Sequence, residues 1–160
     1  MASTISDRRQ RQILALLLGA FSVLSLASVA TYEAPLPGHG PWGSPNACGP
    51  VGATLAFGIV WALGRLASFG VPLATAVWAW NRLRDKPVLP LTLSTLVGAL
   101  LLFEVCTLLG LAGLDRTAWA GTWGFAAALA FHSSLGQVGA WIVGGALFGV
   151  TALAASELGF

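Results

Sequence analysis

The residues in this chain that could support catalysis are few and poorly spaced for it. The only lysine, Lys86, follows Asp85 and not a glycine-rich loop, so the sequence contains no loop of the kind that binds nucleotide phosphates. His132, Ser133 and Ser134 supply a base and two hydroxyls, but sequence neighbours do not face each other on a helix, and no acid lies nearby. We therefore expect no catalytic residues, and expect these three side chains to cap helix ends or bond exposed backbone.

Metal and cofactor ligands are equally sparse. Cys48 and Cys106 lack the CxxC spacing of metal or redox sites, and His39 and His132 lie far apart in the sequence. His39 also falls in a proline-rich stretch, which argues against haem binding. The sequence therefore predicts no metal site, no cofactor and two free thiols.

Arg65 and Glu104 are charges inside otherwise apolar stretches. The separation between Arg65 and Arg82 nearly equals that between Lys86 and Glu104, so both charges should reach a similar depth in a membrane. An intramembrane ion pair between Arg65 and Glu104 is the simpler hypothesis, with the arginine extending towards the lipid headgroups. The alternative is a proton or ion relay, because ionisable groups inside membranes often mark one.

The elements that must position these residues are membrane helices. Of the 160 residues, 56% are apolar and 9% are charged, and residues 12–32 carry no formal charge, which is enough for one crossing. A first span is expected at about 13–31, after a basic cytoplasmic segment, 1–12. The net charge of +2 comes from two small clusters, which orient helices rather than bind nucleic acid. These clusters are Arg8, Arg9 and Arg11, and Arg82, Arg84 and Lys86.

The second apolar stretch, 49–80, is too long for one crossing. As a single helix it would measure roughly 48 Å, whereas the hydrocarbon core is about 30 Å thick. A break near Gly64 keeps Arg65 away from the bilayer centre, where an unpaired charge is costly. This predicts an outer-leaflet or interfacial half-helix at about 49–63 and a span at about 66–82.

Charge distribution predicts the orientation. The proline- and glycine-rich loop 33–47 has no lysine or arginine and suits the outer side, whereas both basic clusters suit the cytoplasm. A third span at about 89–111 then runs outward. An arrangement with up to six crossings would place the second basic cluster outside, so the positive-inside rule disfavours it.

An internal repeat organises the remaining uncharged stretch, 117–156. When the first half is aligned on the second, three of its glycines fall on three glycines of the second half. The repeat predicts a second outer element at about 121–135 and a fourth span at about 136–155. The predicted fold is an all-α integral membrane protein with four transmembrane helices and two interfacial half-helices. The matching glycines are Gly49, Gly52 and Gly64 with Gly121, Gly124 and Gly136.

Small residues on the fourth span predict close helix packing. Gly136, Ala140 and Gly144 share one face, and Gly145 with Gly149 forms a GxxxG motif. Such spacing lets two helix backbones approach closely. Packing within the chain is the simpler hypothesis, and contact between copies is the alternative.

Small residues and prolines in and around the two predicted outer elements, one set beginning at Asn46 and the other at Gly121, form a recognisable pattern. In both sets the chain resembles the N-terminal four-helix membrane domain of the FtsK/SpoIIIE family of bacterial DNA translocases. The basic start and the basic connection between spans two and three are similar to the family as well, whereas the charges of Arg65 and Glu104 are not part of its pattern. The matching positions are Asn46, Gly49, Pro50, Gly52, Ala53, Gly64 and Pro72, and then Gly121, Gly124, Gly136 and Gly139.

The resemblance implies a noncatalytic membrane anchor and divisome-interaction domain, involved in cell division and chromosome segregation. It implies a multi-pass protein of the bacterial inner membrane, with both termini cytoplasmic, at the division septum. The implied partners are the lipid bilayer, division-site membrane proteins and other copies of the chain, as a hexamer if an ATPase motor is attached. These 160 residues contain no motor, and the sequence leaves open whether Phe160 is the natural end.

The sequence leaves two alternatives open. A small transporter or channel built from a parallel repeat would use Arg65 and Glu104 to line a polar path. The first span would instead be a cleaved signal peptide if Ser28, Val29 and Ala30 form a cleavage site, although its apolar run is long for that purpose.

Overall fold

The computed structural model describes residues 2–84 and 88–157, and the elements in this part of the chain are all helical. Within these described ranges, five α-helices are joined by loops and three short helical turns. The elements are α1 (Ala2–Ala30), η1 (Pro41–Gly43), α2 (Gly49–Leu63), η2 (Ala67–Phe69), α3 (Gly70–Leu83), α4 (Val88–Leu111), η3 (Arg116–Ala120) and α5 (Gly121–Glu157).

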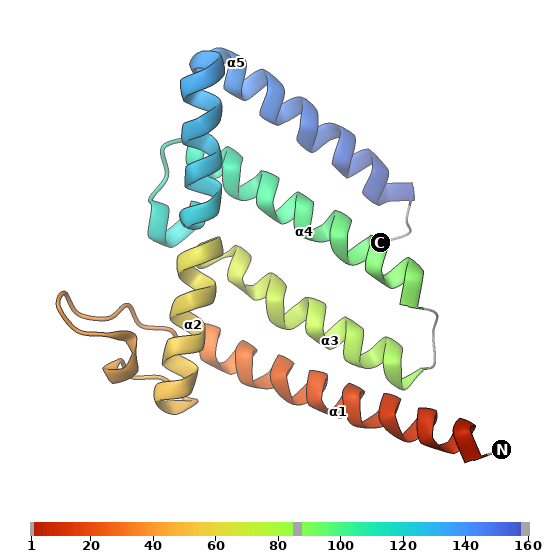
Figure 1. The fold of residues 1–160 in the computed structure, drawn as a ribbon. Coiled ribbons are helices and arrows are strands. Elements are labelled where there is room, and N and C mark those ends of the chain that lie inside the picture. The colour runs from red at the N-terminus through yellow and green to blue at the C-terminus, as the bar shows by residue number, and fades with distance from the viewer. Residues whose placement is uncertain (1, 85–87, 158–160) are drawn as a thin grey trace.

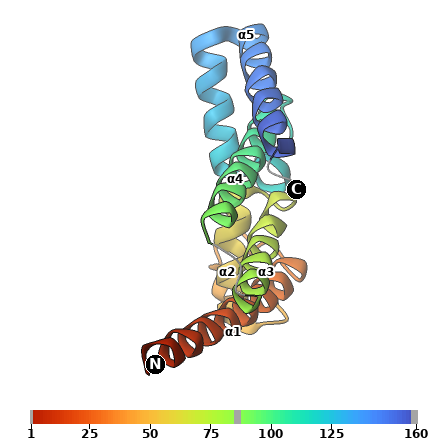
Figure 2. The same ribbon diagram turned by 90° about the vertical axis from the view of Figure 1, so that its right-hand side faces the viewer.

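Four long rods lie side by side in the order α1, α3, α4 and the second part of α5 (Figure 1). Seen from the side, they are stacked one above another (Figure 2). Helix α2 and the first part of α5 lie across one end of the rods, and together they follow one line. The start of α1, the end of α3, the start of α4 and the end of α5 all lie at the opposite end, so the first and last described residues are on the same side.

Two glycines with nearly equal backbone angles turn the short helices into the rods. Gly64 has φ 80° and ψ 164°, and Gly136 has φ 69° and ψ 173°. Residues with a side chain rarely adopt a positive φ, so glycine permits a sharp break at each place. The bend between α2 and the helical stretch 67–83 is 118°, and the second break divides α5 into 121–135 and 137–157.

Among the described residues, three helices are long and apolar enough to cross a membrane: Arg9–Ala30, Pro90–Leu111 and Ala118–Glu157. The bent pair formed by α2 and 67–83 adds a fourth if it counts as one span. The third candidate is itself broken at Gly136. Its second part, residues 137–157, is about 32 Å of helix, which suffices for one crossing. The fold is therefore an all-helical membrane domain of the four-span kind. The expected span limits remain predictions, since no bilayer marks the boundaries.

The interior is built from small residues and the periphery from large apolar ones. Ala56, Ala120 and Ala140 have no exposed surface, whereas Val138 and Leu153 are each at least 70% exposed. This distribution suits a lipid environment, in which helices associate through close packing of small side chains. Helix α1 packs mainly on α3, and α4 mainly on α5, while contact between α3 and α4 is slight. The molecule thus consists of two helical halves, α1–α3 and α4–α5.

Candidate functional site

The two halves meet where the end of α2 abuts the start of α5. A Cβ atom on Gly64 would collide with the carbonyl group of Trp119, and one on Gly121 would collide with the backbone of Ala62 and Leu63. Backbone therefore lies directly against backbone. Two hydrogen bonds complete the contact, which we call the junction: the Arg65 amide donates to the Ala118 carbonyl at 3.0 Å, and the Cys106 thiol donates to the Leu63 carbonyl at 3.2 Å.

Asn46 fastens the outer loop to the end of α1. Its side-chain amide donates to the carbonyls of Ser28 at 2.8 Å and Thr31 at 3.4 Å, while its Oδ1 accepts from the Cys48 amide at 3.0 Å. The Ala47 amide also donates to the Thr31 hydroxyl at 3.1 Å. One side chain, which we call the Asn46 clamp, thus satisfies carbonyls at a helix end and shapes the turn that starts α2.

The repeated glycines serve equivalent roles in the two halves. A Cβ on Gly52 would collide with Asn46 and lie 2.8 Å from the Ser28 hydroxyl of α1, and a Cβ on Gly124 would lie 2.6 Å from the Cys106 carbonyl carbon of α4. Gly49 and Gly121 share φ values of 67° and 66°. The short helix of each half therefore crosses the first rod of that half at a glycine.

Pro50, Ala53 and Pro72, three positions of the sequence pattern, lie at helix starts and crossings. Pro50 is in the first turn of α2, where its missing N–H removes no hydrogen bond, and Ala53 is buried beside Gly52. Pro72 occupies the first turn of α3, and its carbonyl accepts from the Ser22 hydroxyl at 2.8 Å. That bond joins α1 to α3.

Three buried serines on α1 are packing residues that the sequence analysis does not identify. Ser22, Ser25 and Ser28 recur every third residue, and each is at most 7% exposed. Ser25 and Ser28 donate to carbonyls of their own helix, so their small size lets α1 approach its neighbours while no hydroxyl is left unpaired. Their spacing marks one face of a helix and is the signal that could reveal this contact.

Glu104 does not pair with Arg65 in this structure. Its Oε1 accepts from the Thr151 hydroxyl at 2.9 Å, which joins α4 to α5, while its Oε2 is buried with no hydrogen-bond partner among the described residues. The exposed Arg65 side chain lies at the turn between α2 and α3, close to Tyr32. Burial raises the pKa of Tyr32, and the positive charge of Arg65 opposes that rise. Equal depth along two helices does not place the two charges on facing sides.

The small residues of α5 divide into two sets. Ala140 is fully buried, and a Cβ on Gly144 would lie 3.2 Å from Leu108, so these two face α4. A Cβ on Gly145 or Gly149 would meet no atom within 4 Å. The GxxxG motif therefore faces outward from the end of the layer. Of the other predicted members, Gly136 forms the break, and Gly139 is close only to Leu135 of the preceding turn.

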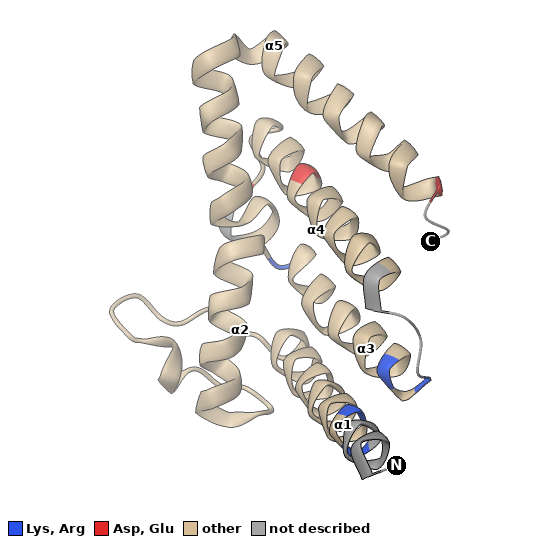
Figure 3. Cartoon of the chain, turned by 45° about the vertical axis from the view of Figure 1, so that its right-hand side comes forward, with Lys and Arg blue, Asp and Glu red and all other residues tan. Residues whose placement is uncertain are grey.

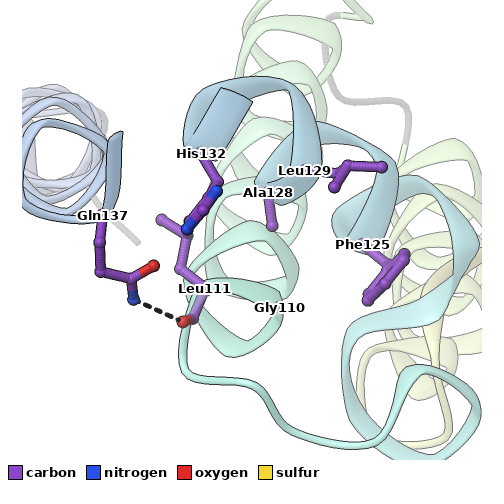
Figure 4. Close-up of a pocket in the computed structure, with 7 residues that line it drawn as sticks. All are labelled: Gly110, Leu111, Phe125, Ala128, Leu129, His132 and Gln137. Carbon is purple, nitrogen blue, oxygen red and sulfur yellow. Dashed lines mark hydrogen bonds between the residues drawn. The ribbon is translucent and has the colours of Figure 1, made fainter. Parts of the chain in front are cut away.

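A pocket of about 270 Å³ lies between α4 and α5, beside the Gly136 break (Figure 4). The His132 side chain extends over Leu111, and the Gln137 amide donates to the Leu111 carbonyl at 3.4 Å. Ser133 donates to the carbonyl of Ala130. The described lining contains no acid, so the pocket offers His132 no partner that would orient it as a base.

Metal binding finds no support in the described residues, among which no group of three or more histidine, cysteine or acidic side chains is close enough to hold an ion. Cys48 and Cys106 are free thiols, the second of them buried against Gly124. The features that stand out are thus packing features: the junction, the Asn46 clamp and the bond between Glu104 and Thr151.

Residues 7–160 match the family model described as the 4TM region of DNA translocase FtsK/SpoIIIE. The chain belongs to this family. The match covers both halves, so the junction and both glycine breaks lie inside the FtsK/SpoIIIE 4TM region. Comparison with curated proteins and with solved structures finds no match.

Proposed function

We propose that the chain is the noncatalytic membrane anchor of an FtsK-like DNA translocase, acting in cell division and chromosome segregation. Membership in the FtsK/SpoIIIE 4TM family carries this proposal. The architecture supports it, because the start of α1 and the end of α5 lie at the same end of the rods, as an anchor requires if it is to hold a soluble part on one side of the membrane.

The orientation we propose has both termini in the cytoplasm of a bacterium, with the chain in the inner membrane. The described arginines of α1, Arg9 and Arg11, and those at the end of α3 lie at one end of the rods (Figure 3). Basic residues favour the cytoplasmic side. The loop 33–47, which has no lysine or arginine, then lies outside together with α2 and 121–135.

The outer side provides the surface for division-site membrane proteins in this proposal. Trp42, Trp61 and Trp123 are each between 49% and 63% exposed and lie in or beside the two short helices and the outer loop. Aromatic side chains are enriched at the energetic centres of protein interfaces. Because the junction joins α2 to α5 backbone to backbone, this surface is a fixed platform rather than two independent parts.

Contact between copies of the chain is part of the same proposal. Gly145 and Gly149 face outward on α5, the last helix of the layer, and GxxxG motifs promote close helix pairing. Such a contact would array several anchors, and a hexamer is expected if a motor follows. The sequence-based hypothesis of packing within the chain applies to Ala140 and Gly144 instead.

A transporter or channel is less well supported. Such a function needs polar groups that converge on a path through the membrane. Arg65 and Glu104 belong to different halves and do not pair. Glu104 instead accepts a hydrogen bond from Thr151, between α4 and α5. The arrangement favours a structural use of both residues.

Localisation tests the proposed function. The chain fused at its N-terminus to a fluorescent protein is expressed at a low level in dividing bacteria, and membrane fractionation verifies its insertion. We expect fluorescence concentrated at the septum. Uniform fluorescence around the membrane, from a fusion that inserts correctly, would contradict a division-site role and leave the fold unaffected.

A further inference from the structure

A long apolar groove runs along one side of the first half, between α1 and α3, and encloses about 710 Å³. Nearly all of the surface that lines it is apolar, and about half of the lining side chains are no larger than alanine. The lining residues are Ala15, Leu16, Gly19, Ala20, Val23, Leu24 and Ala27 of α1, Cys48, and Ala79 and Leu83 of α3.

The dimensions of the groove fit one extended hydrocarbon chain. From Ala15 to Ala27 it follows α1 for roughly 18 Å, which compares with about 15 Å for one leaflet of a 30 Å hydrocarbon core. At Gly19 an added Cβ would lie 4.0 Å from the Cβ of Ala79, an ordinary van der Waals distance, so α1 and α3 are in contact there.

One end of the groove is basic. Arg82 follows Ala79 by one helical turn, and its Nε is buried with no hydrogen-bond partner among the described residues. Arg84 follows Leu83, and its guanidinium lies 4.3 Å from the centre of the Trp80 ring, so the chain holds it near this end. Arg11 lies one turn before Ala15 on α1, and Figure 3 shows the arginines of the two helices at the same end.

We propose that this groove binds one acyl chain of an anionic phospholipid, whose phosphate is held at the basic end by Arg82 and Arg84. An unpaired guanidinium nitrogen at membrane depth is costly, and a phosphate oxygen satisfies both its charge and its hydrogen-bonding capacity. The headgroup end of the site lies where α3 ends, and the apolar groove extends from there towards Cys48 at the start of α2. The headgroup end is cytoplasmic in the orientation of the proposed function, on which this assignment rests.

A lipid explains the site better than a protein segment does. A transmembrane helix is about 10 Å wide with its side chains and would bring apolar residues to the basic end, leaving Arg82 without an anion. A phospholipid combines the apolar chain and the negative group at the required spacing. The second half has no counterpart among the described residues: its pocket is smaller, about 270 Å³, and no lysine or arginine lines it.

Native mass spectrometry of the full chain in detergent tests the site. The protein is titrated separately with phosphatidylglycerol and phosphatidylcholine that carry identical acyl chains. We expect the first phosphatidylglycerol molecule to bind at least fivefold more tightly than phosphatidylcholine, since each basic residue near an anionic lipid contributes about that factor. Equal affinities for the two lipids would overturn the proposal.

Two pairs of variants distinguish this site from general electrostatic attraction. Arg82→Gln should weaken phosphatidylglycerol binding about fivefold, whereas Arg65→Gln removes the same charge at the opposite end and should change nothing. Ala20→Leu fills the exposed wall of the groove and should weaken binding of both lipids, whereas Ala99→Leu on α4 should not.

Each remaining outcome is decisive. Equal effects of the two arginine changes would overturn the headgroup assignment, and an unaltered affinity in Ala20→Leu would overturn the groove. Dimers that dissociate when phosphatidylglycerol is added would show that a second copy occupies the groove instead. Circular dichroism of each variant verifies that it is folded. Because binding is measured in detergent, its failure is independent of the septal localisation that tests the proposed function.

Discussion

The two halves of the molecule share a backbone plan but stabilise it with different chemistry. In α1–α3 the contacts depend on serines of α1 and on the Asn46 side chain, whereas in α4–α5 they depend on the Glu104 carboxylate bonded to Thr151. The shared features are glycines at the crossings and at the breaks. The repeat therefore preserves backbone geometry, and each half supplies its own polar groups.

The two break glycines differ in what surrounds them, which predicts the largest effects. Gly64→Ala adds a methyl group against backbone of the other half, in addition to the strain of its positive φ, whereas Gly136→Ala adds only the strain because no atom lies within 4 Å. We expect Gly136→Ala to lower the free energy of unfolding by about 1–2 kcal/mol and Gly64→Ala to lower it by clearly more. Thermal unfolding in detergent provides the measurement. Equal losses would contradict the junction.

Removal of the Asn46 clamp should have the next largest effect. Asn46→Ala loses two donors to the end of α1 and one acceptor at the start of α2, and we expect a loss of about 2 kcal/mol in the free energy of unfolding. Asn46→Asp serves as the control, because it keeps the acceptor for the Cys48 amide and loses the donors. If Asn46→Asp were as stable as the parent chain, the bonds to the α1 carbonyls would contribute nothing.

The bond between Glu104 and Thr151 should contribute less. A double-mutant cycle of Glu104→Ala and Thr151→Val should give a coupling of about 0.6–1.7 kcal/mol, the range of hydrogen bonds between membrane helices. Glu104→Gln keeps an oxygen acceptor and should remain closer to the parent chain. The cycle of Glu104 with Arg65 should be additive within the error of such measurements, and a clear coupling there would restore the ion pair that the sequence suggests.

The outward GxxxG motif should have the smallest effect on stability. Gly145→Leu places a side chain in open space, so the melting temperature of the monomer should be nearly unchanged. Cross-linking between copies in membranes should fall if this face pairs helices. Gly144→Leu is the matched comparison, because it adds bulk against Leu108 and should destabilise the monomer. A destabilised Gly145→Leu monomer with unaltered cross-linking would rule out the proposed contact between copies.

Sequence patterns predict the course of the backbone better than the partners of side chains. The run 49–80 is too long for one crossing, and its length together with the position of Arg65 and of the nearby glycines and proline therefore predicts a break near Gly64. The partner of Glu104 could not be predicted in the same way. The number of residues sets the depth of Glu104 along α4, but the residue that it contacts depends on how α4 is rotated about its axis. The apolar pattern of α4 is nearly uniform around the helix, so it contains no signal for that rotation.

The serines of α1 show that part of the missing information is present in the sequence. Ser22, Ser25 and Ser28 recur at helical spacing, and that spacing predicts a packing face when small polar residues are considered alongside glycine. The groove beside them cannot be predicted, because it depends on the distance between α1 and α3. That distance follows from the path of the outer loop and the half-helix between them, which no local pattern determines.

Side-specific labelling tests the four-span anchor most directly. In a chain with Cys48→Ala and Cys106→Ala, single cysteines replace His39, Arg84 and Ser156 in turn, and intact bacteria are treated with a maleimide that passes the outer membrane but not the inner one. We predict labelling at position 39 in intact cells, and labelling at positions 84 and 156 only after the inner membrane is opened. Labelling of position 84 or 156 in intact cells, or protection of position 39, would contradict an anchor whose two ends lie in the cytoplasm.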